Sequence, residues 1–113
     1  MVNKNKRIGD DAERAVRDYL QLRNVHAERV PAGNTADIAD IWIPQIWYPA
    51  IQVKNHSRLD LAGWVDDVEI QAANAHRSCG VVVHKRRGKG NPAAWYTTMS
   101  FKTFVDLMER DHV

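Results

Sequence analysis

The sequence predicts an α/β fold of the α+β kind, in which helices pack on a mixed central sheet within a single domain spanning residues 1–113. Three observations predict it. Apolar residues recur at helical spacing over 61–75, apolar and polar residues alternate as in a strand over 50–55, and residues 81–83 form a wholly apolar run typical of a buried strand. Helical segments at both ends of a run of short strands imply a sheet covered by helices.

The first half of the chain begins with a predicted helix. Asp10 is placed to cap it, with Glu13 three residues on as in a capping box, and the apolar pattern fails near Asn24. A strand, a turn and a second strand are expected next, at residues 25–30, 31–34 and 38–43. The order so far is helix, strand, strand.

The second half continues with a hairpin tip bounded by prolines at 44–49, and the strand 50–55 completes the hairpin. The long helix at 61–75 has Gln71 at the border of its apolar stripe, where a polar residue needs no function. Gly80 ends that helical segment, and the strand 81–83 follows.

A basic, glycine-rich loop at 86–92 and a strand at 94–98 come next in the sequence. Ser100 is placed to cap a last helix, whose apolar face is expected to point inward. That face consists of Phe101, Phe104, Val105 and Met108. The complete order is therefore α-β-β-β-α-β followed by β-α.

Charge is balanced overall but unevenly distributed, with 16 Lys+Arg against 14 Asp+Glu. Residues 1–7 carry three cations and no acid, and residues 84–90 carry four cations and no acid. Two such clusters favour an anionic partner, of which nucleic acid is the commonest, although solvated surface loops would show the same pattern. No apolar run is long enough to span a membrane, and the single cysteine, Cys79, excludes an intramolecular disulfide and favours the cytoplasm.

The most informative motif is Ile51-Gln52-Val53-Lys54. In a strand, Gln52 and Lys54 project from the face opposite Ile51 and Val53. Pairing with the preceding strand can bring an upstream carboxylate, from Asp37 or Asp40, beside them. An aspartate, an amide oxygen and an ammonium group at one place suit a divalent metal and a phosphate.

This arrangement resembles the PD-(D/E)XK nuclease superfamily, and within it the small Holliday junction resolvases of the bacteriophage type. The superfamily pattern is a helix carrying a glutamate, an acidic residue before a hairpin, and (D/E)-x-K on the next strand, within an αβββαβ core like that of restriction endonucleases. The matching residues here are Glu13, Asp37 and the Gln52-to-Lys54 strand, with the basic run 84–88 after the buried strand. The resemblance spans roughly residues 4 to 108.

The resemblance implies a role for each matched residue. Asp37 would be the principal ligand of Mg²⁺, or of Mn²⁺ as its substitute, with Gln52 and the Val53 main-chain carbonyl completing the inner shell and Asp40 as the alternative aspartate. Lys54 would orient the attacking water and stabilise the pentavalent phosphate, and Glu13 would contact the metal through water. The bland alternatives are turn chemistry for the aspartates, an edge-strand lysine at 54 and a capping box for Glu13.

Two departures from the superfamily pattern matter. Ala36, not proline, precedes Asp37, and Gln52 stands where the pattern has a carboxylate. An amide oxygen still ligates a hard cation but removes one formal charge, so weaker Mg²⁺ binding is expected. Asp40 or Glu13 could supply that charge; otherwise the protein is a feeble enzyme or a binding-only descendant.

The expected function is therefore that of a Mg²⁺-dependent, structure-selective DNA endonuclease, and a Holliday junction resolvase acting as a homodimer is the first expectation. The expected location is the cytoplasm, which would be the host cytoplasm if the chain is phage-encoded. A flap or single-strand nuclease and a catalytically silent DNA-binding relic are the alternatives. The apolar hairpin tip, with Trp47 and Tyr48, is expected to serve as core, dimer contact or DNA wedge. The expected DNA-binding residues are Lys4, Lys6, Arg7, His56, Lys85, Arg86, Arg87 and Lys89.

Overall fold

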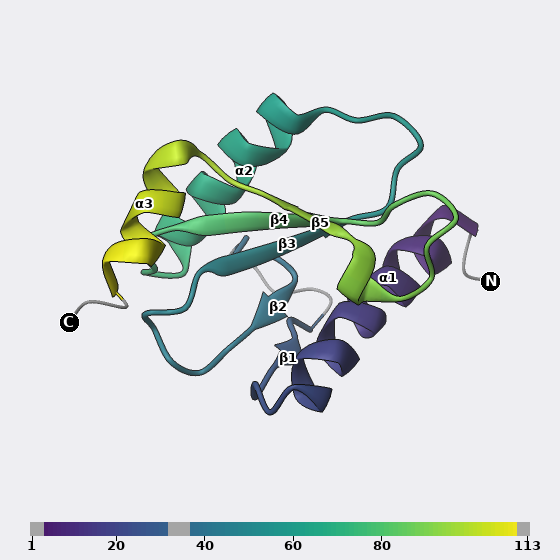
Figure 1. The fold of residues 1–113 in the computed structure, drawn as a ribbon, viewed down its shortest axis with the longest axis horizontal. Coiled ribbons are helices and arrows are strands. Elements are labelled where there is room, and N and C mark those ends of the chain that lie inside the picture. Colours follow the sequence, from purple (N-terminus) through teal and green to yellow (C-terminus); the bar gives the residue numbers. More distant parts are fainter. Residues whose placement is uncertain (1–3, 32–36, 111–113) are drawn as a thin grey trace.

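The computed structural model describes residues 4–31 and 37–110 (Figure 1). The expected turn at 31–34 therefore lies largely outside the described residues. The helices are α1 (Lys4–Leu22), α2 (Leu61–Asn74) and α3 (Phe101–Arg110), with a short 3₁₀ helix η1 (Pro92–Ala94). The strands are β1 (Glu28–Arg29), β2 (Ile41–Trp42), β3 (Ala50–Lys54), β4 (Gly80–His84) and β5 (Tyr96–Thr98).

The strands form one five-stranded mixed sheet in the order β1-β2-β3-β4-β5. β3 and β4 run parallel, because α2 returns the chain between them, and the other neighbouring strands are antiparallel. Register aligns Lys54 with His84 at the carboxyl ends of β3 and β4. The α+β class and the predicted element order are confirmed.

One face of the sheet is covered by α1 and the other by α2 (Figure 1). On the α1 face, Ile51 and Val53 of β3 share a buried cluster with Ala12 and Val16 of the helix. These helix positions are four residues apart and so lie on one side of α1. The apolar half of the β3 alternation therefore meets α1, as its period-two pattern requires.

The opposite face of β3 belongs to the layer under α2. Ala50 packs on Ala72 of α2 in a separate buried cluster. Because side chains alternate along a strand, Gln52 and Lys54 project to this same face. The two polar residues of the motif thus lie on the sheet face that α2 covers.

Gly80 does more than end the α2 segment. A Cβ at this position would lie 2.6 Å from the Val68 carbonyl oxygen and 3.0 Å from its Cγ2. Only glycine allows α2 to approach the first residue of β4 this closely. The close approach fixes the height of α2 above the strand that carries His84.

Two sequence expectations about the helices are wrong. α1 begins at Lys4 rather than after Asp10, so Asp10 is an interior residue whose carboxylate pairs with Lys6 one turn earlier. An acid at this spacing serves an (i, i+4) ion pair as well as it serves a cap, and local pattern alone does not separate the two.

None of the helices in the described ranges is long and apolar enough to span a membrane.

The second wrong expectation is that the apolar face of α3 points inward. Ser100 caps the helix as expected, since its Oγ accepts from the Thr103 amide at 3.1 Å. However, Phe101 is 79% exposed and Phe104 and Met108 are also exposed, whereas Thr103 is buried. Three of the four residues of the apolar stripe are therefore exposed, and Val105 alone of the four is half-buried.

Arg77, between α2 and β4, holds the β2–β3 hairpin. Its buried guanidinium donates to the Gln45 carbonyl at 2.7 Å, to the Tyr48 carbonyl at 3.2 Å and to the Ile43 carbonyl. It also stacks on the Trp42 ring, 4.5 Å from the centroid. One side chain thus satisfies three loop carbonyls that the sheet leaves unpaired.

We expect Arg77→Met to lower the free energy of unfolding by about 3 kcal/mol or more, since it removes the guanidinium donor from all three carbonyls, of which only that of Gln45 keeps another donor among the described residues, the Tyr48 amide. Arg77→Lys should recover less than half of the loss, because an ammonium group lacks the planar fork that reaches several acceptors. Urea denaturation at pH 7 measures both variants. Arg58→Met, in an exposed loop, is the control; an equally small effect at both arginines would refute the assigned role.

Candidate active site and nucleic-acid cleft

Asp40 lies where β2 separates from β3. Its amide donates to the Ile51 carbonyl at 3.0 Å, and its Oδ2 accepts from the Val53 amide at 2.8 Å. Ala39, just before it, has a left-handed φ of 75°. That conformation costs a non-glycine residue roughly 1–2 kcal/mol and is concentrated at functional sites. The strained turn places a carboxylate directly against the backbone of β3.

The Asp40 carboxyl is electrostatically unusual. Burial raises its pKa from 3.8 to about 6, although the Val53 amide and Lys54 oppose the change, and the negative charges of Glu13 and Asp37 raise this pKa further. A carboxyl responds to a neighbour in this way only when the charge is close. The charges of Asp37, Glu13 and Lys54 therefore act on the Asp40 carboxyl at the start of the β2–β3 hairpin.

Asp37 is held by α2. Its exposed carboxylate accepts from Gln71 Nε2 at 3.1 Å, and its main-chain carbonyl accepts from Asn74 Nδ2 at 2.9 Å. These contacts put Asp37 on the α2 side of the sheet, the side to which Lys54 projects. Asp40, and not Asp37, contacts the β3 backbone.

Gln52 has a buried side-chain oxygen, Oε1, with no hydrogen-bond partner among the described residues, and Gln71 Oε1 shares this property. A buried acceptor without a donor costs about 1–3 kcal/mol. Two aspartates, the Gln52 oxygen and the Val53 carbonyl are hard oxygen donors of the kind that Mg²⁺ and Mn²⁺ take. The unpartnered Gln52 oxygen, on the strand whose Val53 amide contacts Asp40, fits a hard cation.

This set of oxygen donors contains few carboxylates, however. Within residues 4–31 and 37–110, no three His, Cys, Asp or Glu side chains are grouped closely enough to hold a metal ion by themselves. Gln52 is the physical reason on this strand, because it contributes a neutral oxygen. A metal here would depend on amide and main-chain oxygens.

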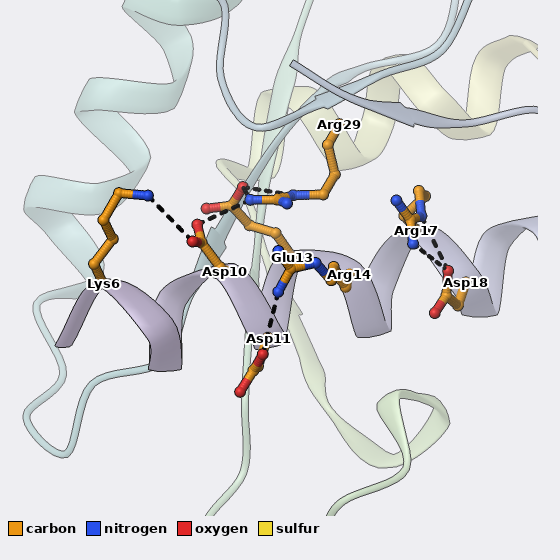
Figure 2. A network of polar contacts seen from close by, with 8 residues as sticks. All are labelled: Lys6, Asp10, Asp11, Glu13, Arg14, Arg17, Asp18 and Arg29. Atoms are coloured by element: carbon orange, nitrogen blue, oxygen red, sulfur yellow. Dashed lines mark hydrogen bonds and ion pairs between the residues drawn. The ribbon is translucent and has the colours of Figure 1, made fainter. Parts of the chain in front are cut away.

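Glu13 is engaged by an arginine (Figure 2). Arg29 of β1 contacts its Oε1 through Nη2 at 3.1 Å and through Nε at 3.3 Å, and also binds Asp10 Oδ1 at 2.9 Å. Lys6 closes the network on the other Asp10 oxygen at 3.2 Å. Farther along α1, Arg14 pairs with Asp11 and Arg17 with Asp18. Since α1 begins at Lys4, Glu13 is an interior residue and not part of a capping box, which was the alternative to its role at the site; it joins α1 to β1.

A cleft of about 930 Å³ opens at the carboxyl ends of β3 and β4. This end of parallel strands is where open α/β sheets bind ligands. Four of the expected DNA-binding residues line it: His56, Lys85, Arg86 and Arg87. Lys54, the last residue of β3, adjoins it, because its carbonyl accepts from the Lys85 amide at 3.0 Å and its neighbour Asn55 lines the cleft.

The remaining expected DNA-binding residues lie outside the cleft wall. Lys4, Lys6 and Arg7 are exposed on the first turns of α1, interleaved with the cleft residues Asn5 and Ile8. Cations at a helix N-terminus are disfavoured by the helix dipole, so a nearby anion would stabilise them. Lys89 is exposed one residue beyond the cleft loop.

Sequence reasoning missed three contributors to this region. Arg29 was not singled out, because nothing local connects a residue of a two-residue strand to Glu13. Gln71 was assigned no function, although a glutamine inside an apolar stripe was a usable signal. Tyr96 was regarded only as part of a strand. All three are brought to the site by contacts between distant segments.

Comparisons with protein-family models, curated proteins and solved structures find no match for this chain. The site's chemistry therefore carries the functional argument.

Proposed function

We propose that this protein is a divalent-metal-dependent, structure-selective DNA endonuclease with an active site of the PD-(D/E)XK kind. The observation that supports this most is the contact of the Asp40 carboxylate with the Val53 amide, because β3 then carries Lys54 to the border of a basic cleft. Acids that accept a metal, a lysine that meets a phosphate and a groove that holds a polyanion are the three parts that phosphodiester hydrolysis needs.

The metal would be held by Asp40, Asp37, the Gln52 side-chain oxygen and the Val53 carbonyl. When bound, Mg²⁺ or Mn²⁺ would supply positive charge against the scissile phosphate. We place Asp40 before Asp37 in this set, because the Asp40 carboxylate already contacts the β3 backbone and is the more buried of the two. Gln71 keeps Asp37 oriented toward the same layer.

Lys54 is the proposed catalytic residue. Its ammonium group would donate to the attacking water and to a non-bridging phosphate oxygen, so that negative charge on the pentavalent phosphate is stabilised as the water oxygen bonds to phosphorus. The attacking water releases one proton to solvent as its oxygen bonds to phosphorus. The bond from phosphorus to the leaving sugar oxygen breaks on the opposite side, and that oxygen takes up a proton from solvent. Glu13, bound to Arg29, positions α1 against the site.

A four-way junction is the first proposed substrate, cut by a homodimer, since two-fold symmetry matches its paired strands. Apolar side chains are available for self-association on α3 and at the hairpin tip, where Phe101 is 79% and Trp47 60% exposed. The proposed location is the cytoplasm, where the protein would meet such a substrate. Base identity would matter little, because phosphate contacts and shape govern recognition without base-edge readout.

The direct test is incubation of the protein with end-labelled four-way junction, flap, single-stranded and duplex DNA in Mg²⁺, Mn²⁺ or EDTA. We expect metal-dependent nicks in the branched substrates, placed symmetrically in the junction. Tight, salt-sensitive binding without cleavage in any metal would reject the nuclease and support the silent relic.

Gln52→Glu tests the metal site from the opposite direction. Restoring a carboxylate should tighten Mg²⁺ binding by about tenfold, because ligand charge sets the affinity of oxygen sites for hard cations. Isothermal titration calorimetry measures the change. Gln45→Glu adds the same charge at the exposed hairpin tip and should leave the Mg²⁺ affinity unchanged; equal effects from both variants would contradict the site.

A further inference from the structure

A continuous row of rings supports the floor of the cleft, and three of its four members, His56, His84 and Tyr96, line the cleft itself. His56 and Trp64 have centroids 5.8 Å apart, Trp64 and His84 are 5.7 Å apart, and His84 meets the edge of Tyr96 at 5.8 Å. The Arg86 guanidinium lies 4.8 Å from the centroid of the Tyr96 ring and ends the row. These residues come from four separate segments, so the row is a product of the fold.

The row is rigid at its centre and open at its end. Trp64 and His84 are buried, and His84 Nε2 is held 2.7 Å from Thr98 Oγ1. Burial lowers the pKa of His84, so its ring is neutral at pH 7 and adds no charge to the floor. Tyr96 is 54% exposed and lines the cleft. Its ring is therefore a supported aromatic surface about half of which stays open to the cleft, although Arg86 lies over the ring.

Cations surround this surface at fixed positions. Arg86 is anchored by a bond from Nη1 to the Ala94 carbonyl at 3.2 Å, so its guanidinium stays over Tyr96. The next residues form a tight turn, in which the Lys89 amide donates to the Arg86 carbonyl at 3.2 Å and Gly88 has a φ of 76°. That conformation suits the third position of a type II turn and exposes Arg87 at the cleft edge.

We propose that this cleft binds an unpaired segment of a DNA strand, with a base stacked at Tyr96 and Arg86 and the adjoining phosphates on Lys85 and Arg87. A duplex keeps its base faces covered, so a floor of rings offers it nothing, whereas an unpaired base gains a stacking partner. The inference rests on the proposed nuclease for its choice of DNA. It narrows the substrate class to branched DNA in which the nucleotides next to the scissile phosphate are unpaired, or become unpaired on binding, as those of a fully paired four-way junction would have to.

The test is fluorescence anisotropy in EDTA, which blocks metal-dependent cleavage, with fluorescein-labelled single-stranded, flap and duplex DNA and single-stranded RNA of equal length. Wild-type protein should bind the single strand and the flap at least about tenfold more tightly than the duplex, as one stacked base provides. Tyr96→Leu should lose this preference and leave duplex binding unchanged, and Tyr96→Phe should retain it. Arg87→Gln should weaken all DNA ligands alike, and Tyr19→Leu, on α1 away from the cleft, should change none.

A 2-aminopurine base in the single strand supplies a second readout. Its fluorescence should be quenched on binding to wild-type protein and to Tyr96→Phe, and not by Tyr96→Leu. Equal affinity for duplex and single strand, or a preference for RNA over DNA, would overturn the inference. Metal-dependent cleavage that is independent of Tyr96 would overturn it and leave the nuclease intact. Tyr96-dependent binding of unpaired DNA without cleavage in any metal would contradict the proposed nuclease activity and support the inference about the cleft.

Discussion

Lys54→Met should abolish DNA cleavage, with a loss of at least a hundredfold to a thousandfold in the rate constant, the usual cost of deleting one preorganised donor to transition-state charge. The ammonium group projects from the last position of β3, on the α2 face of the sheet and at the border of the cleft. Its removal leaves the apolar face of β3 intact, so the fold should persist. Single-turnover cleavage of a labelled branched substrate in Mg²⁺ measures the effect.

Binding in EDTA separates catalysis from affinity for this variant. Lys54 would contribute one of several phosphate contacts, so junction affinity should fall by no more than about threefold. Lys102→Met is the matched control, because Lys102 is 82% exposed and pairs with Asp106 on α3. Cleavage by Lys54→Met within tenfold of wild type would refute the assignment of the catalytic residue.

Asp40→Asn should stop metal-dependent cleavage and stabilise the metal-free protein above pH 6. Burial raises the pKa of the Asp40 carboxyl to about 6, well above its unfolded value. The group therefore favours folding fully below its unfolded pKa, and this contribution is lost as pH rises through 6. At pH 8 the ionised carboxylate costs up to roughly 3 kcal/mol, which asparagine avoids while its oxygen still accepts from the Val53 amide.

Urea denaturation at pH 4 and pH 8 without metal tests the sign. The variant should exceed wild type in unfolding free energy at pH 8 and match it at pH 4. Added Mg²⁺ should stabilise wild type and not the variant, since only the former binds the cation. Asp66→Asn, at an exposed position of α2, should show no such pH dependence. A variant less stable than wild type at pH 8 would show that the carboxylate supports the fold.

Most of the fold could be predicted from periodicity. The apolar–polar alternation around Gln52 and the apolar stripe of α2 both arise because one side of each element is buried, and both are confirmed. The first helix was placed too late because an acid within it resembles a cap. The outward face of α3 could not be predicted, because an apolar stripe indicates burial without naming the partner that covers it.

The candidate site, like the fold, is only partly predictable from the sequence. Gln52 and Lys54 share a face because strands have a period of two, and this follows from the sequence. The contact of Asp40 with Val53 depends on the left-handed turn at Ala39, which no local pattern signals. The partner of Glu13 depends on where β1 crosses α1, which is a property of the assembled sheet. The residue types of the site can therefore be predicted from the sequence, whereas their contact partners depend on tertiary packing.

Paramagnetic broadening by Mn²⁺ tests the shared metal site most directly. In a titration of ¹⁵N-labelled protein with substoichiometric Mn²⁺, amide signals of residues 38–40 and 52–54 should broaden first, and those of residues 45–47 and α3 should remain sharp. Asp40→Asn should prevent the broadening. Signals that broaden first elsewhere, or that stay sharp at residues 52–54 throughout, would contradict a metal site formed by Asp40, Asp37 and Gln52 beside Lys54.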